Sequence, residues 1–208
     1  MPTKIVSKKP APDGRMLRSR LTREKIVAAI SLLIREGCLI PTAEQVAERA
    51  GIGRRTVFRH FDDMESLNRD INQLVMADVV AALNQPLVAP SWQERLFEDI
   101  AIRCALYDSI ASFHIAAQIT RHQSSSIGEV MDLYASLHLE RLRRILPLDM
   151  VDHAPTFHGL ALIISMDAWI RLRREQGLDA EAASAVIEHA ASALITGASK
   201  AEPISPGA

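Results

Sequence analysis

The stretch TAEQVAERAGIGRRTVFRHFDDMESL, residues 42–67, decides the fold of the N-terminal part of the chain. Thr42 and Gln45 have the spacing of a capping box, which predicts the start of a short helix. Gly51 has the conformational freedom to end that helix in a tight turn. A second short helix is predicted from about residue 54 to residue 61. Two short helices around a glycine turn predict a helix-turn-helix.

A longer helix is predicted on each side of this motif. The first starts at Thr22 as its cap, carries one apolar stripe and ends at Gly37. Asp62 or Asp63 is expected to cap the helix that follows the motif and ends near a linker at residues 85–90. Its predicted buried face consists of Leu67, Ile71, Leu74, Val75 and Val79.

The rest of the chain shows helical periodicity and no alternating strand pattern. Capping boxes at Ser91 with Glu94 and at Ser126 with Glu129 predict two helix starts. Between them, residues 93–122 are long enough for two helices with a bend near Asp108.

Proline and glycine mark the later boundaries. Pro147 ends one helix, Pro155 opens the next, Gly177 ends that one, and Asp179 caps a last helix that ends at Gly197. The predicted fold is all-α with about nine helices: a helix-turn-helix domain at residues 19–66 and a helical ligand-binding and dimerisation domain at residues 67–198.

Charge divides the chain in the same way. Residues 1–70 hold 14 Lys and Arg against 9 Asp and Glu, a net charge of +5, whereas residues 71–208 hold 10 against 16, a net charge of −6. This asymmetry favours an N-terminal part that binds a polyanion, the alternative being a solvated basic tail. Residues 1–18 are predicted to be a flexible basic arm and residues 199–208 a flexible tail. The arm can enter a DNA groove or add sequence-independent attraction, and we expect the second.

Several other classes of protein are excluded by the composition. Hydrophobic residues make up 48% of the chain, which is enough to form a core. There is no uncharged apolar run of about 18 residues, so no membrane span is expected. The N-terminus lacks the apolar region of a secretory signal. Cys38 and Cys104 both lie in apolar contexts, which is typical of a reducing cytoplasm.

No motif for catalysis or metal binding is present. The chain has no glycine-rich phosphate loop, nucleophile elbow or Cys-His signature. His114 with His122, and His153 with His158, lack the one-turn spacing of a helical zinc site. The sequence therefore predicts neither an enzyme nor a cofactor.

The second helix of the motif carries a set of side chains that suits a DNA groove. Arg54, Arg55, Thr56, Arg59 and His60 offer hydrogen-bond donors on a short rod, which fits a major groove. The alternative is a structural helix hairpin with a solvated basic face.

The whole stretch, residues 42–67, resembles the DNA-binding motif of the TetR family of bacterial transcriptional regulators. The resemblance implies a DNA-binding domain joined to an all-α dimerising domain, and usually a repressor that a small molecule releases from DNA. It also implies phosphate contacts at Thr56, Phe58 and His60. Phe58 stands where the family usually has Tyr, so it can contact sugar or a thymine methyl but cannot donate to phosphate. Met64 stands where the family often has Lys, which removes a second phosphate contact. The complete set of predicted DNA contacts is Thr42, Arg54, Arg55, Thr56, Phe58, Arg59 and His60.

The last two helices are predicted to form the dimer interface. Residues 159–164 are apolar on every side of the helix, which implies burial on more than one face. The final helix is rich in alanine, so another helix can approach it closely. We therefore expect a two-fold four-helix interface, the alternative being an intramolecular core alone. A dimer suits two reading heads that bind successive major grooves about 34–36 Å apart.

An effector pocket is expected among the helices of residues 92–170. Its candidate lining residues, each equally suited to an ordinary core, are Phe97, Cys104, Tyr107, Phe113, His114, Gln118, Met131, Tyr134, His138, Met166 and Trp169. Few charges lie among them, which favours a neutral, mostly apolar small molecule. The sequence thus predicts a cytoplasmic homodimeric repressor of a palindromic operator; the alternative is a ligand- or partner-binding helical protein with weakened DNA recognition.

Overall fold

The computed structural model describes residues 14–198, apart from the side chain of Arg15. In this range the chain forms ten α-helices, one 3-10 turn and one π-helical turn, and no strand, so the prediction of an all-α fold is confirmed. The helices form two compact units, Met1–Leu67 and Asn68–Ala208. Each unit is described separately below.

The first helix starts earlier than predicted. α1 spans Gly14–Arg35, so Thr22 lies inside the helix and is not its cap. The Thr22 hydroxyl donates to the Arg18 carbonyl at 2.9 Å, as threonine side chains in helices often do. Residues 14–18 were predicted as arm and are helical; the remainder of that arm lies outside the described residues. Gly37, with φ 96°, ends the helix as expected.

Two short helices and the start of α4 complete the N-terminal unit. α2 spans Ala43–Ala50, α3 spans Arg54–Phe61 and α4 starts at Met64. The fully buried residues Ile26, Val46, Val57 and Leu67 form their common core. Arg23 on α1 donates to the Ser66 hydroxyl at 2.5 Å, which links α1 to the beginning of α4.

The fourth helix continues from the first unit into the second. α4 spans Met64–Leu83 and buries Leu67, Ile71 and Val79, as predicted. Val75, between Ile71 and Val79, is half-buried. Leu74 is exposed, because it falls at the edge of the stripe that these residues form at four-residue intervals.

The centre of the second unit is one uninterrupted helix. α5 spans Trp92–Thr120, so the predicted bend near Asp108 is wrong. Asp108 and Ser109 are exposed, and the Ser109 hydroxyl donates to the Leu106 carbonyl at 2.7 Å, which leaves the backbone helical. α6, α9 and α10 all contact this helix.

The remaining helices correct two further boundaries. The 3-10 turn Arg121–Gln123 precedes α6, Ser125–Ile145, whose N-cap is Ser124, so the predicted capping box at Ser126 is wrong. Ser126 is buried inside the helix, and its hydroxyl hydrogen-bonds to that of Ser124. The short α7, Leu148–Asp152, follows Pro147.

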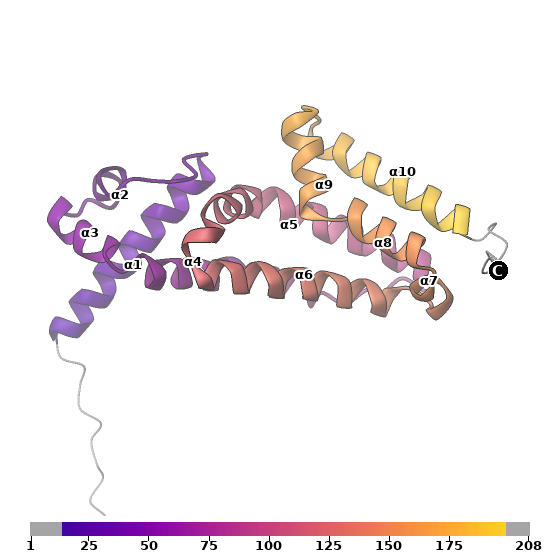
Figure 1. Ribbon diagram of the computed structural model, residues 1–208, viewed down its shortest axis with the longest axis horizontal. Helices are drawn as coiled ribbons and strands as arrows, with labels where there is room; N and C mark the ends of the chain where they lie inside the picture. Colours follow the sequence, from indigo (N-terminus) through magenta and orange to yellow (C-terminus); the bar gives the residue numbers. More distant parts are fainter. Residues whose placement is uncertain (1–13, 199–208) are drawn as a thin grey trace, which may run out of the picture. The chain divides into compact units, whose positions relative to one another are not determined.

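The helix predicted from Pro155 to Gly177 is divided. α8 spans Ala154–Ile163, α9 spans Met166–Ile170, and a π-helical turn, Arg171–Glu175, follows. The break occurs where the Ser165 hydroxyl accepts the Ala168 N–H and caps α9. α10, Ala180–Ala198, is capped by Asp179 as predicted and lies beside α8 (Figure 1).

The segment Trp92–Gln123 has the length and apolar composition to cross a membrane, although charged residues interrupt it. In the described part of the chain no other helix is both long and apolar enough to do so. The segment consists of α5 and the turn after it, and α5 supplies much of the buried core of the second unit. A core helix of a folded domain has the same composition.

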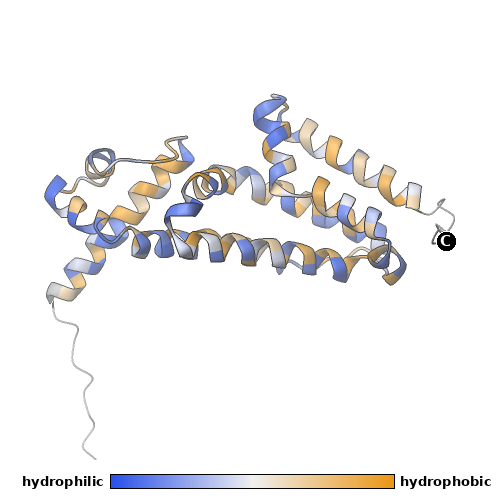
Figure 2. Ribbon diagram, in the orientation of Figure 1, coloured by the Kyte–Doolittle hydropathy of each residue, from blue (hydrophilic) through white to orange (hydrophobic). Residues whose placement is uncertain are grey.

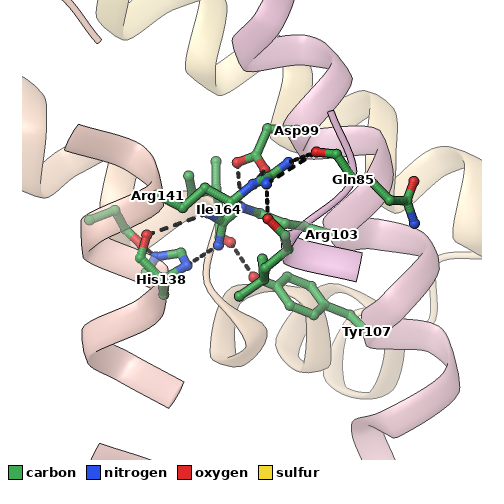
Figure 3. Close-up of polar contacts among 9 residues, drawn as sticks. Gln85, Asp99, Arg103, Tyr107, His138, Arg141 and Ile164 are labelled. Atoms are coloured by element: carbon green, nitrogen blue, oxygen red, sulfur yellow. Dashed lines mark hydrogen bonds and ion pairs between the residues drawn. The ribbon is translucent and has the colours of Figure 1, made fainter. Parts of the chain in front are cut away.

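A buried ionic network joins four helices of this unit (Figure 3). Asp99 on α5, with 0% exposure, accepts from Arg103 Nε at 2.5 Å and from Arg141 Nε on α6. Arg141 also donates to the Leu83 carbonyl at the end of α4. Arg103 donates to Nδ1 of His138, whose Nε2 lies 3.0 Å from the Ala161 carbonyl on α8. Each buried charge is therefore paired.

Candidate nucleic-acid interface

The turn between α2 and α3 has the geometry that the sequence predicts. The Thr42 N–H donates to Gln45 Oε1 at 2.8 Å, and the Gln45 N–H donates to the Thr42 hydroxyl at 3.3 Å, so both halves of the capping box are present. Gly51 lies in the left-handed region with φ 63°. The Ile52 N–H donates to the Ala47 carbonyl at 3.1 Å and closes the end of α2.

The two helices are held together by small and branched apolar residues. Ala43, Val46 and Ala47 on α2 are buried, as is Val57 on α3. Phe61, the last residue of α3, is half-buried. The ion pair between Arg49 and Glu36, with N–O distances of 2.7 and 2.6 Å, further attaches α2 to the end of α1. This packing leaves the opposite side of α3 facing solvent.

The exposed side of α3 carries three cations. Arg54, Arg55 and Arg59 are exposed, and the described part of the structure offers none of them an ion pair or a side-chain hydrogen bond. Their guanidinium donors are therefore available to a ligand. Phe58, 47% exposed, lies among them and offers an apolar surface without a hydroxyl donor.

The other predicted DNA contacts flank these cations. Thr42 is exposed at the start of α2, with its hydroxyl engaged in the capping box. Thr56 and His60 are half-buried on α3. Burial, and then the charges of Arg59 and Arg23, lower the pKa of His60, while Asp63 opposes them. The imidazole is therefore neutral in the free protein at pH 7, and a bound phosphate would favour its protonation.

The predicted effector-pocket residues lie in the second unit, mostly in its core. Cys104, Tyr107, Phe113, His138, Met166 and Trp169 are buried, Phe97, His114, Met131 and Tyr134 are half-buried, and Gln118 is exposed. Several of them make structural contacts. The Tyr107 hydroxyl donates to the Ile164 carbonyl at 2.8 Å, and Gln118 donates to Asp167 at 2.8 Å, beside His114.

A groove in the second unit is lined by different residues. It lies where the end of α4, the linker after it and α6 meet, and none of the predicted pocket residues borders it. The pocket was predicted among aromatic and Met residues, whereas arginines next to leucines line this groove. Arg141 and Arg144, near the end of α6, are the sequence feature that could have indicated this groove.

Comparison with known proteins agrees with the geometry of the N-terminal unit. Residues 26–71 match the family model of bacterial regulatory proteins, tetR family, which covers the C-terminal part of α1, all of α2 and α3, and the first turns of α4. No curated protein matches the chain. The matched segment contains the glycine turn and the cationic face of α3. Residues 26–71 therefore match the DNA-binding domain of the tetR family of bacterial regulatory proteins, which supports a DNA-binding transcription regulator.

Proposed function

We propose that the chain is a homodimeric repressor that binds a palindromic operator and is released from it by a small molecule. The observation that carries the proposal is the cationic face of α3, where Arg54, Arg55 and Arg59 are exposed and lack an ionic partner within the described range. On a rigid helix, such side chains enter a major groove and contact guanine or phosphate. Thr42, Thr56, Phe58 and His60 would position the helix on the backbone.

The proposed dimer forms through α8 and α10, which contact each other within the chain. Leu162 on α8 is 68% exposed, and Val186 on α10 is also exposed. Alanines dominate α10, whose turns are mostly pale or orange in Figure 2. Small exposed residues on adjacent helices permit a close two-fold packing of the four helices of two subunits.

The dimer proposal is tested by placing a charge on these helices. Leu162→Glu with Val186→Glu should convert the protein to a monomer in sedimentation velocity at micromolar concentration. Leu148→Glu on α7 is the matched control, because Leu148 is 79% exposed and lies outside α8 and α10. A wild-type protein that sediments as a monomer, or a double variant that stays dimeric, would contradict the proposed interface.

Release by an effector has a defined energetic requirement. An effector can weaken operator binding only by its differential affinity for the free and DNA-bound states. A hundredfold release corresponds to about 2.7 kcal/mol of coupling. The second unit, which contains the buried core and the groove, is where we place the effector.

Repression through an operator is tested by titrating the protein onto DNA from upstream of its own gene. We expect one fragment to bind at least a hundredfold more tightly than random DNA at moderate salt, with affinity that falls steeply as salt increases. A reporter gene behind that fragment should be repressed.

A protein without preference for any fragment at any salt concentration would support the second candidate, a ligand- or partner-binding protein with weakened DNA recognition. Phe58 and Met64 favour this alternative, because both are exposed at positions where the family usually has a phosphate-binding side chain.

A further inference from the structure

A groove of about 270 Å³ lies on the second unit, at the junction of the end of α4, the linker that follows it, the start of α5 and the last turns of α6. It is open to solvent along one side. Its lining residues are Leu83, Asn84, Gln85, Leu87, Arg95, Leu137, Glu140, Arg141, Arg144 and Ile145.

The lining has an apolar part and a cationic part. Leu83, Leu87, Leu137 and Ile145 supply the apolar surface. Three arginines and a single carboxylate supply the charge. Residues 71–208 have a net charge of −6 and only ten Lys and Arg, so a groove that holds three of these cations is a local exception in an acidic unit.

The three arginines differ in how many donors the protein uses. Arg141 donates to Asp99 and to the carbonyls of Leu83 and Gln85, which fix its position in the groove wall. Figure 3 shows Arg141 beside Asp99 and Gln85. Arg95 donates through NH1 to the Ala89 and Pro90 carbonyls at 3.1 and 3.0 Å. Arg144 donates through Nε to Glu140 at 3.1 Å.

Arg95 and Arg144 therefore retain donors for a ligand. A guanidinium has five N–H groups, and the described contacts of Arg95 engage NH1 alone, while those of Arg144 engage Nε alone. A planar carboxylate fits two neighbouring N–H groups of such a fork. The apolar surface beside them suits a hydrocarbon chain or ring.

The volume limits the size of this ligand. A water molecule occupies about 30 Å³ in the liquid, so the groove corresponds to about nine waters and holds a ligand of about ten non-hydrogen atoms. We propose that the groove binds a small amphiphilic monocarboxylate, with its carboxylate against Arg95 and Arg144 and its apolar part against the leucines.

Such a ligand would act on α4. Leu83 is the last residue of α4 and borders the groove, and the same helix starts at Met64 in the DNA-binding unit. A molecule that packs against Leu83 and the linker prefers one position of this helix end, and its differential affinity is the source of regulation. That the carboxylate is the effector rests on the proposed repressor function.

The binding site is tested with three probes of the same chain length: octanoate, octanol and octylammonium. Calorimetric titration of the full-length protein should give saturable binding of octanoate and at least tenfold weaker binding of the two other probes. Arg95→Gln should weaken octanoate binding about tenfold or more, because a charge-assisted hydrogen-bond pair is lost. Arg144→Gln should weaken it less, because that side chain is well exposed.

Two further variants separate binding from folding. Arg143→Gln removes the same charge one residue away, from a side chain that lies over the Phe157 ring and does not border the groove, and should leave octanoate binding within twofold of wild type. Asn84→Trp fills the groove from an exposed position and should abolish binding without lowering Tm. Octanol binding as tight as octanoate binding, or equal octanoate affinity in all variants, would overturn the site.

Regulation is measured separately, on the operator fragment. Octanoate should weaken operator binding by wild type and by Arg143→Gln, but not by Asn84→Trp. If octanoate saturates the groove while operator affinity stays unchanged, the site stands and its role as effector site is overturned. If the protein binds octanoate but no operator, the repressor proposal fails and the binding site does not.

Discussion

The arginines of α3 and two arginines of the second unit, Arg103 on α5 and Arg141 on α6, have opposite environments. Arg54, Arg55 and Arg59 project into solvent, and within the described residues no carboxylate pairs with them. Arg103, 1% exposed, and Arg141 share the buried carboxylate of Asp99. The guanidinium groups on α3 have free hydrogen-bond donors, whereas those of Arg103 and Arg141 donate to acceptors within the protein.

This difference separates two uses of one side chain. Exposed guanidinium groups contribute little to folding and are available to a polyanion. A buried ion pair also adds little net stability, because desolvation offsets its attraction, but the removal of one partner leaves an uncompensated charge. Changes to the Asp99 network should therefore act on folding, and changes on α3 should act on DNA binding alone.

The largest effect is expected at Asp99. Asp99→Asn leaves Arg103 and Arg141 without their shared carboxylate, so the free energy of unfolding should fall by about 3–5 kcal/mol. Urea unfolding measures it. Asp132→Asn, which breaks the exposed pair with Arg121, is the control and should change the value by less than about 1 kcal/mol. Similar losses of unfolding free energy in both variants would contradict the expected difference between the buried and the exposed ion pair.

The next effect is the pH dependence of stability caused by His138. Burial, and then the Arg103 charge, lower the pKa of His138 from 6.5 to about 4. The unfolded chain therefore binds a proton at higher pH than the folded one, so this contribution to stability is fully present above pH 6.5 and is lost as the pH falls toward 4. The loss amounts to about 3 kcal/mol across that window.

His138→Gln tests the predicted loss of stability as the pH falls. The variant keeps a hydrogen-bonding side chain but does not titrate, so its unfolding free energy should fall less steeply between pH 6.5 and 4 than that of wild type. His60 and His114, whose pKa values burial also lowers, contribute with the same sign and remain in the variant. An exposed-site control is His122→Gln. A wild-type slope in His138→Gln would show that the network tolerates a protonated imidazole.

The helix-turn-helix was predictable from sequence because local signals define it. The capping box at Thr42, the turn at Gly51 and the spacing of Val46 and Val57 act over a few residues. α5 was predicted with a bend because Asp108 and Ser109 resemble a break, whereas their exposure lets the helix continue. The break at Ser165 depends on packing that no local pattern reveals.

The groove illustrates a second limit of sequence reasoning. Arg95 and Arg141 are 46 positions apart, and each alone is typical of a solvated helix face. Only the packing of the linker after α4 against α6 brings them together beside Leu83 and Leu137. The Asp99 network was equally hidden, because its members come from four helices.

Arg55 tests the other side of the comparison. Arg55→Ala should weaken operator binding by about 1–3 kcal/mol if the side chain contacts a guanine, and should relax preference at that base pair. Competition binding against a set of single-base operator variants measures both. Because Arg55 is exposed and makes no described polar contact, Tm should stay unchanged.

The control for Arg55 is Arg171→Ala, which removes an exposed cation from the second unit and breaks only a surface pair with Glu175. It should bind the operator as wild type does. An Arg55→Ala variant with unchanged affinity and base preference would remove Arg55 from the reading face and leave Arg54 and Arg59 as its candidates.

The smallest effect is expected at His60, which lies between the two environments. It is half-buried on α3, faces the cations Arg59 and Arg23 and the carboxylate of Asp63, and has a lowered pKa, mainly through burial. A DNA phosphate beside the ring would favour the protonated form, so operator binding should take up a proton. The affinity of wild type should therefore rise a few-fold more between pH 8 and pH 6 than that of His60→Gln. Fluorescence anisotropy at constant salt measures the ratio of the two affinities at each pH. If this ratio stays constant, His60 contacts no phosphate and its role is confined to the packing of α3.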